Sequence, residues 1–357
     1  MTFSRKRRIK FRLNIDNSFV SIARLFRSKC SNSDTFPDER VISEDKEDSV
    51  SDPFAVFAQY VWPFLRLAIR LPRRCDKCVT LLQNDEPNTC TFCRGYVAEK
   101  NEVSLRPLVI EGGDRLLLLL SGGKDGIYVL GRLREEYPNI PIECVLIDTG
   151  FLGPRALQNA QAATERLRVD FRVVRSYIGQ FRIVLREAFC KLKRNPSASC
   201  YGVVDYAEGN LIFDIGIRLA KESRQRIVSG LTSSQLALID APIKRVPDAL
   251  FPLDTWRPNE EEILVAARHV AGRGSRFGPL DTNSTLILPM SALDILRNGF
   301  CGFEPEFSRN IREGVSDRTC WLHRFEALKW LVENGFLDRC LDESLASLDL
   351  ERKDVLS

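Results

Sequence analysis

The chain has 357 residues, of which 44% are hydrophobic and 28% charged, and its formal net charge is +4. This length predicts one main domain of roughly 150 to 200 residues with smaller appendages. No segment approaches the ~20 consecutive apolar residues that span a bilayer, so the composition argues against a transmembrane protein and predicts a soluble one.

The eleven cysteines are too widely spread to form the dense disulfide framework of a small secreted protein. No signal-peptide pattern precedes them. We therefore expect thiols that stay reduced and a cytoplasmic location.

Residues 1–52 predict a flexible tail whose two parts have opposite charge. Residues 1–30 carry nine lysines and arginines against Asp16 alone, and residues 31–52 carry eight acidic residues with few large apolar side chains. High charge with low hydrophobicity favours disorder. We interpret the basic part as a solvated tail; contact with RNA, contact with an acidic membrane surface and an organellar transit peptide are the alternatives.

Residues 53–100 combine an apolar run with a cysteine-rich module. Residues 54–71 are apolar except where Pro63 and two arginines interrupt them, which predicts a packing helix or a pair of helices. Two CxxC pairs, eleven residues apart, then supply four thiolates, the ligand set of a tetrahedral structural zinc. The predicted ligands are Cys75, Cys78, Cys90 and Cys93. An iron–sulfur centre and a redox pair are the alternatives.

Residues 101–250 alternate short apolar runs with longer amphipathic stretches, which is typical of βαβ units. This alternation predicts a doubly wound α/β fold, a parallel sheet with helices on both faces. The predicted strands are 116–120, 142–148, 171–175 and 226–230. Four helices are predicted between them: one begins near Asp125, one begins near Pro154, and two cover about 180–193 and 206–222.

Ligand sites of such sheets lie beyond the carboxyl ends of the strands. At the first of these ends, five leucines run directly into Ser121-Gly122-Gly123-Lys124-Asp125-Gly126 and then into a helical stretch. Glycines permit close approach of the backbone to a ligand, and the N–H groups of a helix start attract phosphate. Lys124 adds a positive charge. The segment therefore predicts a phosphate-binding loop, although it is neither a Walker A nor a GxGxxG motif.

This loop resembles SGGxDS, the signature of the PP-loop ATP pyrophosphatases, with Gly126 in place of the usual serine. Asp148-Thr149-Gly150-Phe151, Ser229-Gly230-Leu231-Thr232 and the block from Ser199 to Gln235 resemble further parts of that family, and the resemblance covers roughly residues 115–240. It implies a fold of the adenine nucleotide α-hydrolase type that binds ATP and Mg2+ and releases AMP and pyrophosphate.

The resemblance also implies roles for individual residues. The pyrophosphate would be held by Ser121, Gly122, Gly123, Lys124, Asp125 and Gly126. Lys124 and Asp125 would act in catalysis, Asp125 through magnesium. Gly230 and Thr232 would support the phosphates, and Asp148 and Thr149 would lie near adenosine.

Cysteine knuckles ahead of a PP-loop occur in the N-acetyl sugar amidotransferases and in the tRNA thiolation enzymes, which this chain resembles. Members of both groups would adenylate an oxygen of an acceptor, which could be a sugar, a small metabolite or a tRNA base. We favour nitrogen transfer. Because this chain shows no glutaminase motif, the ammonia would come from a separate glutaminase. Sulfur transfer from a donor protein is the first alternative. A module that binds nucleotide or RNA without turnover is the second.

Cys200 is the candidate functional thiol of the sulfur-transfer alternative. Thiolation enzymes usually carry Cys-x2-Cys at this loop, whereas Val203 stands at the partner position here. Cys301 or Cys190 could complete a site in space. Nitrogen transfer needs no such cysteine.

Residues 251–357 are expected to be mainly helical. Residues 318–345 predict a helix that places Trp321, Phe325, Leu328 and Leu331 on one side. Such a surface would form either a cap on the preceding domain or the contact of a homodimer.

Overall fold

A computed structural model of the chain describes residue 54 and residues 57–96, 108–232, 235, 242–272, 275, 277 and 284–356. All of these belong to one compact unit, Glu47–Ser357. The basic and acidic segments predicted for residues 1–52 lie outside the described residues.

A four-stranded parallel sheet with the order β3-β2-β1-β4 lies at the centre of this unit. Its strands are β1 (Leu116–Leu119), β2 (Ile142–Ile147), β3 (Asp170–Val174) and β4 (Arg226–Val228). In the register of the sheet, Leu118 of β1 lies opposite Cys144 on one side and Val228 on the other. The strands are those that the apolar runs predicted, within a residue or two at each end.

Helices cover both faces of the sheet, because alternate side chains of each strand point to opposite sides. On one face Leu117 packs under α7 (Ile178–Arg194) and α8 (Tyr206–Ser223). On the other face Leu118 packs in a cluster with α5 (Lys124–Glu136), α6 (Pro154–Leu167) and α11 (Glu260–Ala271).

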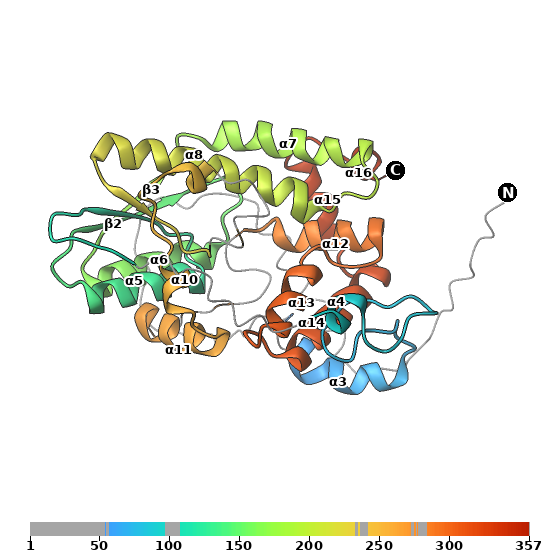
Figure 1. Ribbon diagram of the computed structural model, residues 1–357. Coiled ribbons are helices and arrows are strands. Elements are labelled where there is room, and N and C mark those ends of the chain that lie inside the picture. Colours follow the sequence, from blue (N-terminus) through green and yellow to red (C-terminus); the bar gives the residue numbers. More distant parts are fainter. Residues whose placement is uncertain are drawn as a thin grey trace, which may run out of the picture. The chain divides into compact units, whose positions relative to one another are not determined.

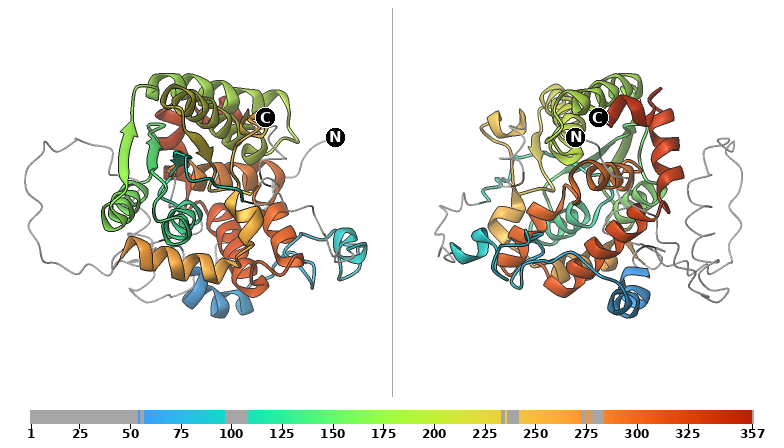
Figure 2. Two further views of the ribbon diagram at one scale, coloured as in Figure 1. Left: turned by 60° about the vertical axis from the view of Figure 1, so that its left-hand side comes forward. Right: turned by 90° about the vertical axis from the view of Figure 1, so that its right-hand side faces the viewer.

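Figure 1 shows these two helical layers above and below the strands, and Figure 2 shows them from two further sides. The doubly wound α/β class is therefore confirmed.

The C-terminal region forms mainly helices, as predicted. The helices that follow α11 there are α12 (Ile287–Asn298), α13 (Glu304–Arg312), α14 (Arg318–Glu333), α15 (Asp338–Ala346) and α16 (Arg352–Val355). The single helix predicted for residues 318–345 is wrong, since α14 ends before Asn334 and Gly335 has a φ of +77°. Glycine takes up this left-handed conformation without a steric penalty, which ends the helix.

The apolar run before the cysteine module forms short helical turns: η1 (Phe57–Val61), α3 (Trp62–Leu65) and η2 (Arg66–Ala68). Trp62 is fully buried, and its ring nitrogen donates to Glu326 of α14 over 3.1 Å. The segment is thus a packing element, as the interrupting proline predicted. None of the helices that the structure describes combines the length and apolar character needed to cross a membrane.

Four further short helices complete the described chain. They are α4 (Thr91–Arg94), the π-helical turn η3 (Tyr201–Asp205), the 3-10 turn η4 (Pro242–Arg245) and α10 (Pro252–Trp256).

Candidate active site

The predicted phosphate loop connects β1 directly to α5 at the carboxyl edge of the sheet. Gly123 is extended and immediately precedes α5, a helix of thirteen residues. The first N–H groups of such a helix have no acceptor within the helix. They carry the positive end of its dipole, so an anion placed at this end is stabilised.

Gly122 brings the loop into contact with the first turn of α6. Its φ is +75°, and a β-carbon at this position would lie 1.8 Å from the carbonyl oxygen of Ala156. The side chain of Asn159, also on α6, donates to the carbonyl oxygen of Gly122 over 3.4 Å. Only glycine fits here, which leaves the loop backbone with no covering side chain at position 122.

Gly230 brings the turn after β4 against the start of α5. A β-carbon at Gly230 would lie 2.9 Å from the α-carbon of Gly126. A β-carbon at Gly126 would lie 3.3 Å from a methyl group of Leu120, so the serine of the family signature would need only a small shift of that side chain. The structure thus brings together the loop 121–126 and the turn 230–232, two segments about a hundred residues apart. Their roles in binding stay predictions.

Lys124 and Asp125 form an ion pair, with the ammonium 2.9 Å and 3.0 Å from the two carboxylate oxygens. Burial alone would lower the pKa of Lys124, but the charge and hydrogen bond of Asp125 and the charges of Glu260 and Glu306 outweigh it. The net pKa of Lys124 is raised, so this side chain stays a cation. Glu260 begins α11, where Asn259 and Glu262 form a capping box.

Asp148 and Thr149 follow β2 at the same edge of the sheet. The Asp148 carboxylate accepts from the backbone N–H of Gly150 over 2.9 Å and pairs with exposed Arg175 over 3.2 Å. Thr149 is buried and hydrogen-bonds Glu208 of α8. Burial raises the pKa of Glu208, and the Thr149 hydrogen bond opposes that change. Proximity of either residue to adenosine stays a prediction.

The π-helical turn η3 adds groups that sequence reasoning missed. Burial and then the charges of Glu208 and Glu306 raise the pKa of Asp205 to about 8. Tyr201 donates its hydroxyl to Glu306 over 2.5 Å. Single π-helical turns are frequent at functional sites. The sequence held no spacing signal for this contact, since Tyr201 and Glu306 are 105 residues apart.

Cys200 lies at the start of the same turn and is fully buried. Its backbone N–H donates to Asp294 of α12 over 2.5 Å. Burial, the charge of Asp294 and a hydrogen bond to it raise the pKa of the Cys200 thiol well above its ordinary value. Of the two partners considered for it, Cys301 is buried and close enough to influence that pKa, whereas Cys190 is exposed.

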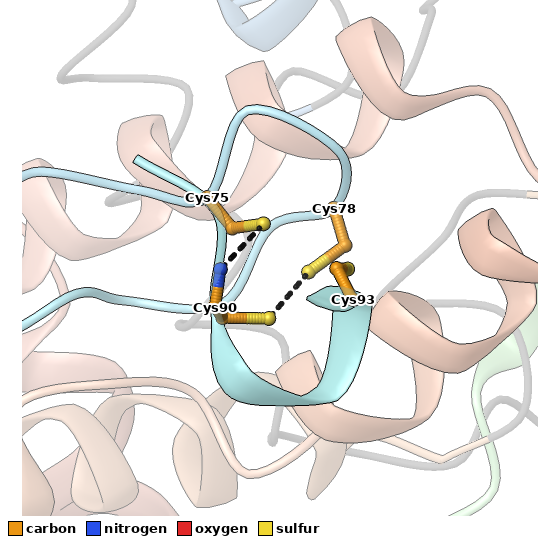
Figure 3. Close-up of side chains that lie close together, drawn as sticks. All are labelled: Cys75, Cys78, Cys90 and Cys93. Atoms are coloured by element: carbon orange, nitrogen blue, oxygen red, sulfur yellow. Dashed lines mark hydrogen bonds between the residues drawn. The ribbon is translucent and has the colours of Figure 1, made fainter. Parts of the chain in front are cut away.

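The cysteine module gathers its four sulfurs into one cluster. The sulfurs of Cys75, Cys78, Cys90 and Cys93 all lie within 4.8 Å of one another, and all four residues are buried. Figure 3 shows the side chains pointing toward one centre from two loops and the short helix α4. Four converging thiols in a buried pocket have the chemistry of a metal site. The predicted grouping is confirmed.

The C-terminal helices hold this module in place. Arg74 forms a buried ion pair with Glu304 of α13, with nitrogen–oxygen distances of 2.7 Å and 3.1 Å. Arg318 of α14 donates to the carbonyl oxygens of Cys78 and Cys75 over 3.0 Å and 2.6 Å. The cluster is therefore docked on the helices that follow the sheet.

Comparison with known proteins gives distant likenesses. No family model matches the chain. A 124-residue stretch is 30% identical to an uncharacterized protein of Methanocaldococcus jannaschii, MJ1599, covering 34% of this chain and 42% of that protein. The chain thus matches less than half the length of this relative.

Among solved structures, the U34-tRNA thiolase NcsA from Methanococcus maripaludis with its 4Fe–4S cluster is similar at 18% identity. The match has a TM-score of 0.34 and covers 76% of this chain and 89% of the thiolase chain. A score this low does not transfer the activity of that enzyme to this chain.

Replacing Gly122 with alanine should destabilise the protein. We expect Gly122→Ala to lower the free energy of unfolding by about 2 kcal/mol or more, because the new methyl meets the Ala156 carbonyl in a left-handed backbone. Gly179→Ala is the control, since nothing lies within 4 Å of a β-carbon there. Urea unfolding and binding of an ATP analogue would be measured. Equal behaviour of the two variants would contradict the close contact.

Proposed function

We propose that this chain is an ATP pyrophosphatase that adenylates an oxygen of an acceptor. The observation that carries the proposal is the meeting of two glycine turns at the start of α5, with Lys124 beside them. Backbone N–H groups, a helix dipole and a cation together suit a polyphosphate. The resemblance of the loop to SGGxDS supports pyrophosphate as the leaving group.

The first step transfers an adenylyl group. The acceptor oxygen attacks the α-phosphorus of ATP and the bond from that phosphorus to the β-phosphate oxygen breaks, so AMP stays on the acceptor and pyrophosphate leaves. The loop and Lys124 stabilise charge on the departing pyrophosphate. Mg2+, when bound with ATP, would neutralise phosphate charge, and we expect Asp125 to hold it.

The second step replaces the activated oxygen, and we propose nitrogen as the nucleophile. A thiol must ionise to attack, and burial with a neighbouring carboxylate keeps Cys200 protonated. The environment of Cys200 therefore supports ammonia over a reaction through this thiol. Ammonia would attack the adenylated carbon, AMP would leave with the former acceptor oxygen, and a separate glutaminase would supply the ammonia. A sugar is the favoured acceptor.

Sulfur transfer is the second candidate, because Cys301 lies near Cys200. A thiol of this pair would become a persulfide by accepting the outer sulfur of a donor protein's persulfide, which would leave the donor as a thiol. The acceptor would then be a small metabolite or a tRNA.

We further propose that the cysteine cluster binds a structural zinc ion. Zinc–sulfur bonds of about 2.3 Å in a tetrahedron place sulfurs about 3.8 Å apart, and the sulfurs of Cys78 and Cys90 are 3.8 Å apart. A four-iron cluster would hold its cysteine sulfurs farther apart, since each binds a different iron. Zinc with four protein ligands has no open position, so its role would be to stabilise the module.

The adenylating reaction can be tested with ATP labelled at the α-phosphate. In the presence of Mg2+ and cell extract, we expect wild-type protein to form AMP and pyrophosphate, and Asp125→Ala to lose about 100-fold or more of that activity. Asp85→Ala, at an exposed position of the cysteine module, is the control. Formation of ADP alone, or tight binding without AMP, would instead favour a module that binds nucleotide without turnover.

The choice between nitrogen and sulfur can be tested at Cys200. We expect Cys200→Ala to retain AMP formation and product within about threefold of wild type, because a buried, protonated thiol takes no part in the transfer of ammonia to the adenylated acceptor. Cys190→Ala, at the exposed cysteine of α7, is the matched control. If the folded Cys200→Ala protein forms AMP but loses more than about 100-fold of product, nitrogen transfer is wrong and sulfur transfer is favoured.

The zinc proposal predicts one zinc and no iron per purified, reduced chain. Cys90→Ser should lose the metal and unfold more readily, because three thiolates and a hydroxyl bind zinc less well than four thiolates. Cys320→Ser, at an exposed cysteine, should keep it. Metal content would be measured by mass spectrometry of the digested protein. A protein with no metal, or with about four irons, would contradict this proposal.

A further inference from the structure

Glu306 of α13 joins three segments that are far apart in the sequence. One carboxylate oxygen accepts from the Tyr201 hydroxyl over 2.5 Å, and the other accepts from the side-chain amide of Gln235 over 3.0 Å. Tyr201 begins the turn η3, and Gln235 follows the Gly230 turn. Glu306 therefore connects a C-terminal helix to the turn η3 and to the segment that follows the Gly230 turn.

The amide of Gln235 continues this chain of hydrogen bonds. Its oxygen accepts from the backbone N–H of Thr232 over 2.9 Å and from the Thr232 hydroxyl over 3.1 Å. The Gln235 backbone N–H donates in return to the Thr232 hydroxyl oxygen over 3.2 Å. An ionised carboxylate only accepts hydrogen bonds. Glu306 therefore turns the amide nitrogen of Gln235 toward itself and the amide oxygen toward Thr232.

We infer that Glu306 is a positioning residue of the nucleotide site, which orients Gln235 and through it holds the turn 230–232 against the phosphate loop. The inference rests on the proposed function, because it assigns this turn to ATP binding. It names a residue outside the 115–240 region that resembles the PP-loop family.

The charge of Glu306 also reaches the phosphate loop itself. It is among the charges that keep the pKa of Lys124 raised, with Asp125 and Glu260. The same carboxylate thus affects both the Gly230 turn and the lysine beside the other glycine loop. The hydrogen bond of Glu306 to Gln235 and its charge near Lys124 can be tested separately, because glutamine at position 306 would remove only the charge.

The position of α13 is fixed from its other side by the cysteine module. Glu304, two residues before Glu306, holds Arg74, and Ser308 accepts a hydrogen bond from Thr80 over 3.1 Å. Glu304 and Ser308 are both buried. Glu306 is therefore presented by a helix that is anchored on two sides, which a positioning residue requires.

A swap of the two side chains tests the inference. The full-length protein would be titrated with α,β-methylene-ATP and Mg2+ by calorimetry, as wild type, Gln235→Glu, Glu306→Gln and the double variant. Gln235→Glu places two carboxylates together and should weaken binding about tenfold or more. Glu306→Gln keeps an acceptor for Gln235 but loses the charge, and should stay within about threefold of wild type.

The double variant is decisive because it restores the hydrogen bond with reversed polarity. Its new amide at position 306 can donate to the new carboxylate at position 235, whose other oxygen still accepts from Thr232. Binding should therefore return to within about threefold of wild type. Glu313→Gln, on an exposed residue just after α13, is the control.

Two results would overturn the inference. The double variant could bind as weakly as Gln235→Glu, or Gln235→Glu could bind like wild type. If wild type fails to bind the analogue, the proposed function itself is wrong.

Discussion

The close backbone contacts made by Gly122 and Gly230 at the carboxyl edge of the sheet are the constraint on which the site depends. Gly122 lies against the first turn of α6, and Gly230 lies against Gly126 at the start of α5. Neither contact leaves room for a β-carbon. Since β1 and β4 are neighbours in the sheet, the loops that follow them are forced together. The parallel topology and the glycines therefore together bring the backbone N–H groups of these loops close to one another.

Three carboxylates influence the lysine at this point, and this affects how a nucleotide could bind. Lys124 shares its surroundings with Asp125, Glu260 and Glu306. Free ATP would be repelled by these carboxylates, whereas its magnesium complex would be partly neutralised. The electrostatics of the site therefore favour ATP accompanied by a divalent cation.

Most of the fold could be predicted from the sequence because its signals are local. Five leucines before a glycine-rich segment identify a buried strand and its turn, and two CxxC pairs identify the thiol cluster. The break in the predicted helix 318–345 was also marked by Asn334-Gly335, a signal that the apolar periodicity outweighed.

Glu306 and Tyr201 could not be predicted in the same way. Neither belongs to a motif, and a glutamate or tyrosine in a helical segment is common on a protein surface. They become site residues only because α13 packs beside the turn η3, a contact between segments 105 residues apart. Long-range packing of this kind has no fixed spacing in the sequence. The parts of the site that hold other parts in place are therefore the last to be recognised from sequence.

The short helix α13 gives the cysteine cluster a role beyond its own stability. Glu304 and Glu306 lie two residues apart, one bound to Arg74 of the module and the other to Gln235 beside the Gly230 turn. A buried ion pair such as Arg74–Glu304 is costly to break, because the remaining charge would be left without a partner. Any change that loosens the module would therefore also shift the helix that presents Glu306. If the cluster binds a metal and the site binds a nucleotide, as proposed, the metal would stabilise that site from a distance, without contributing a ligand to it.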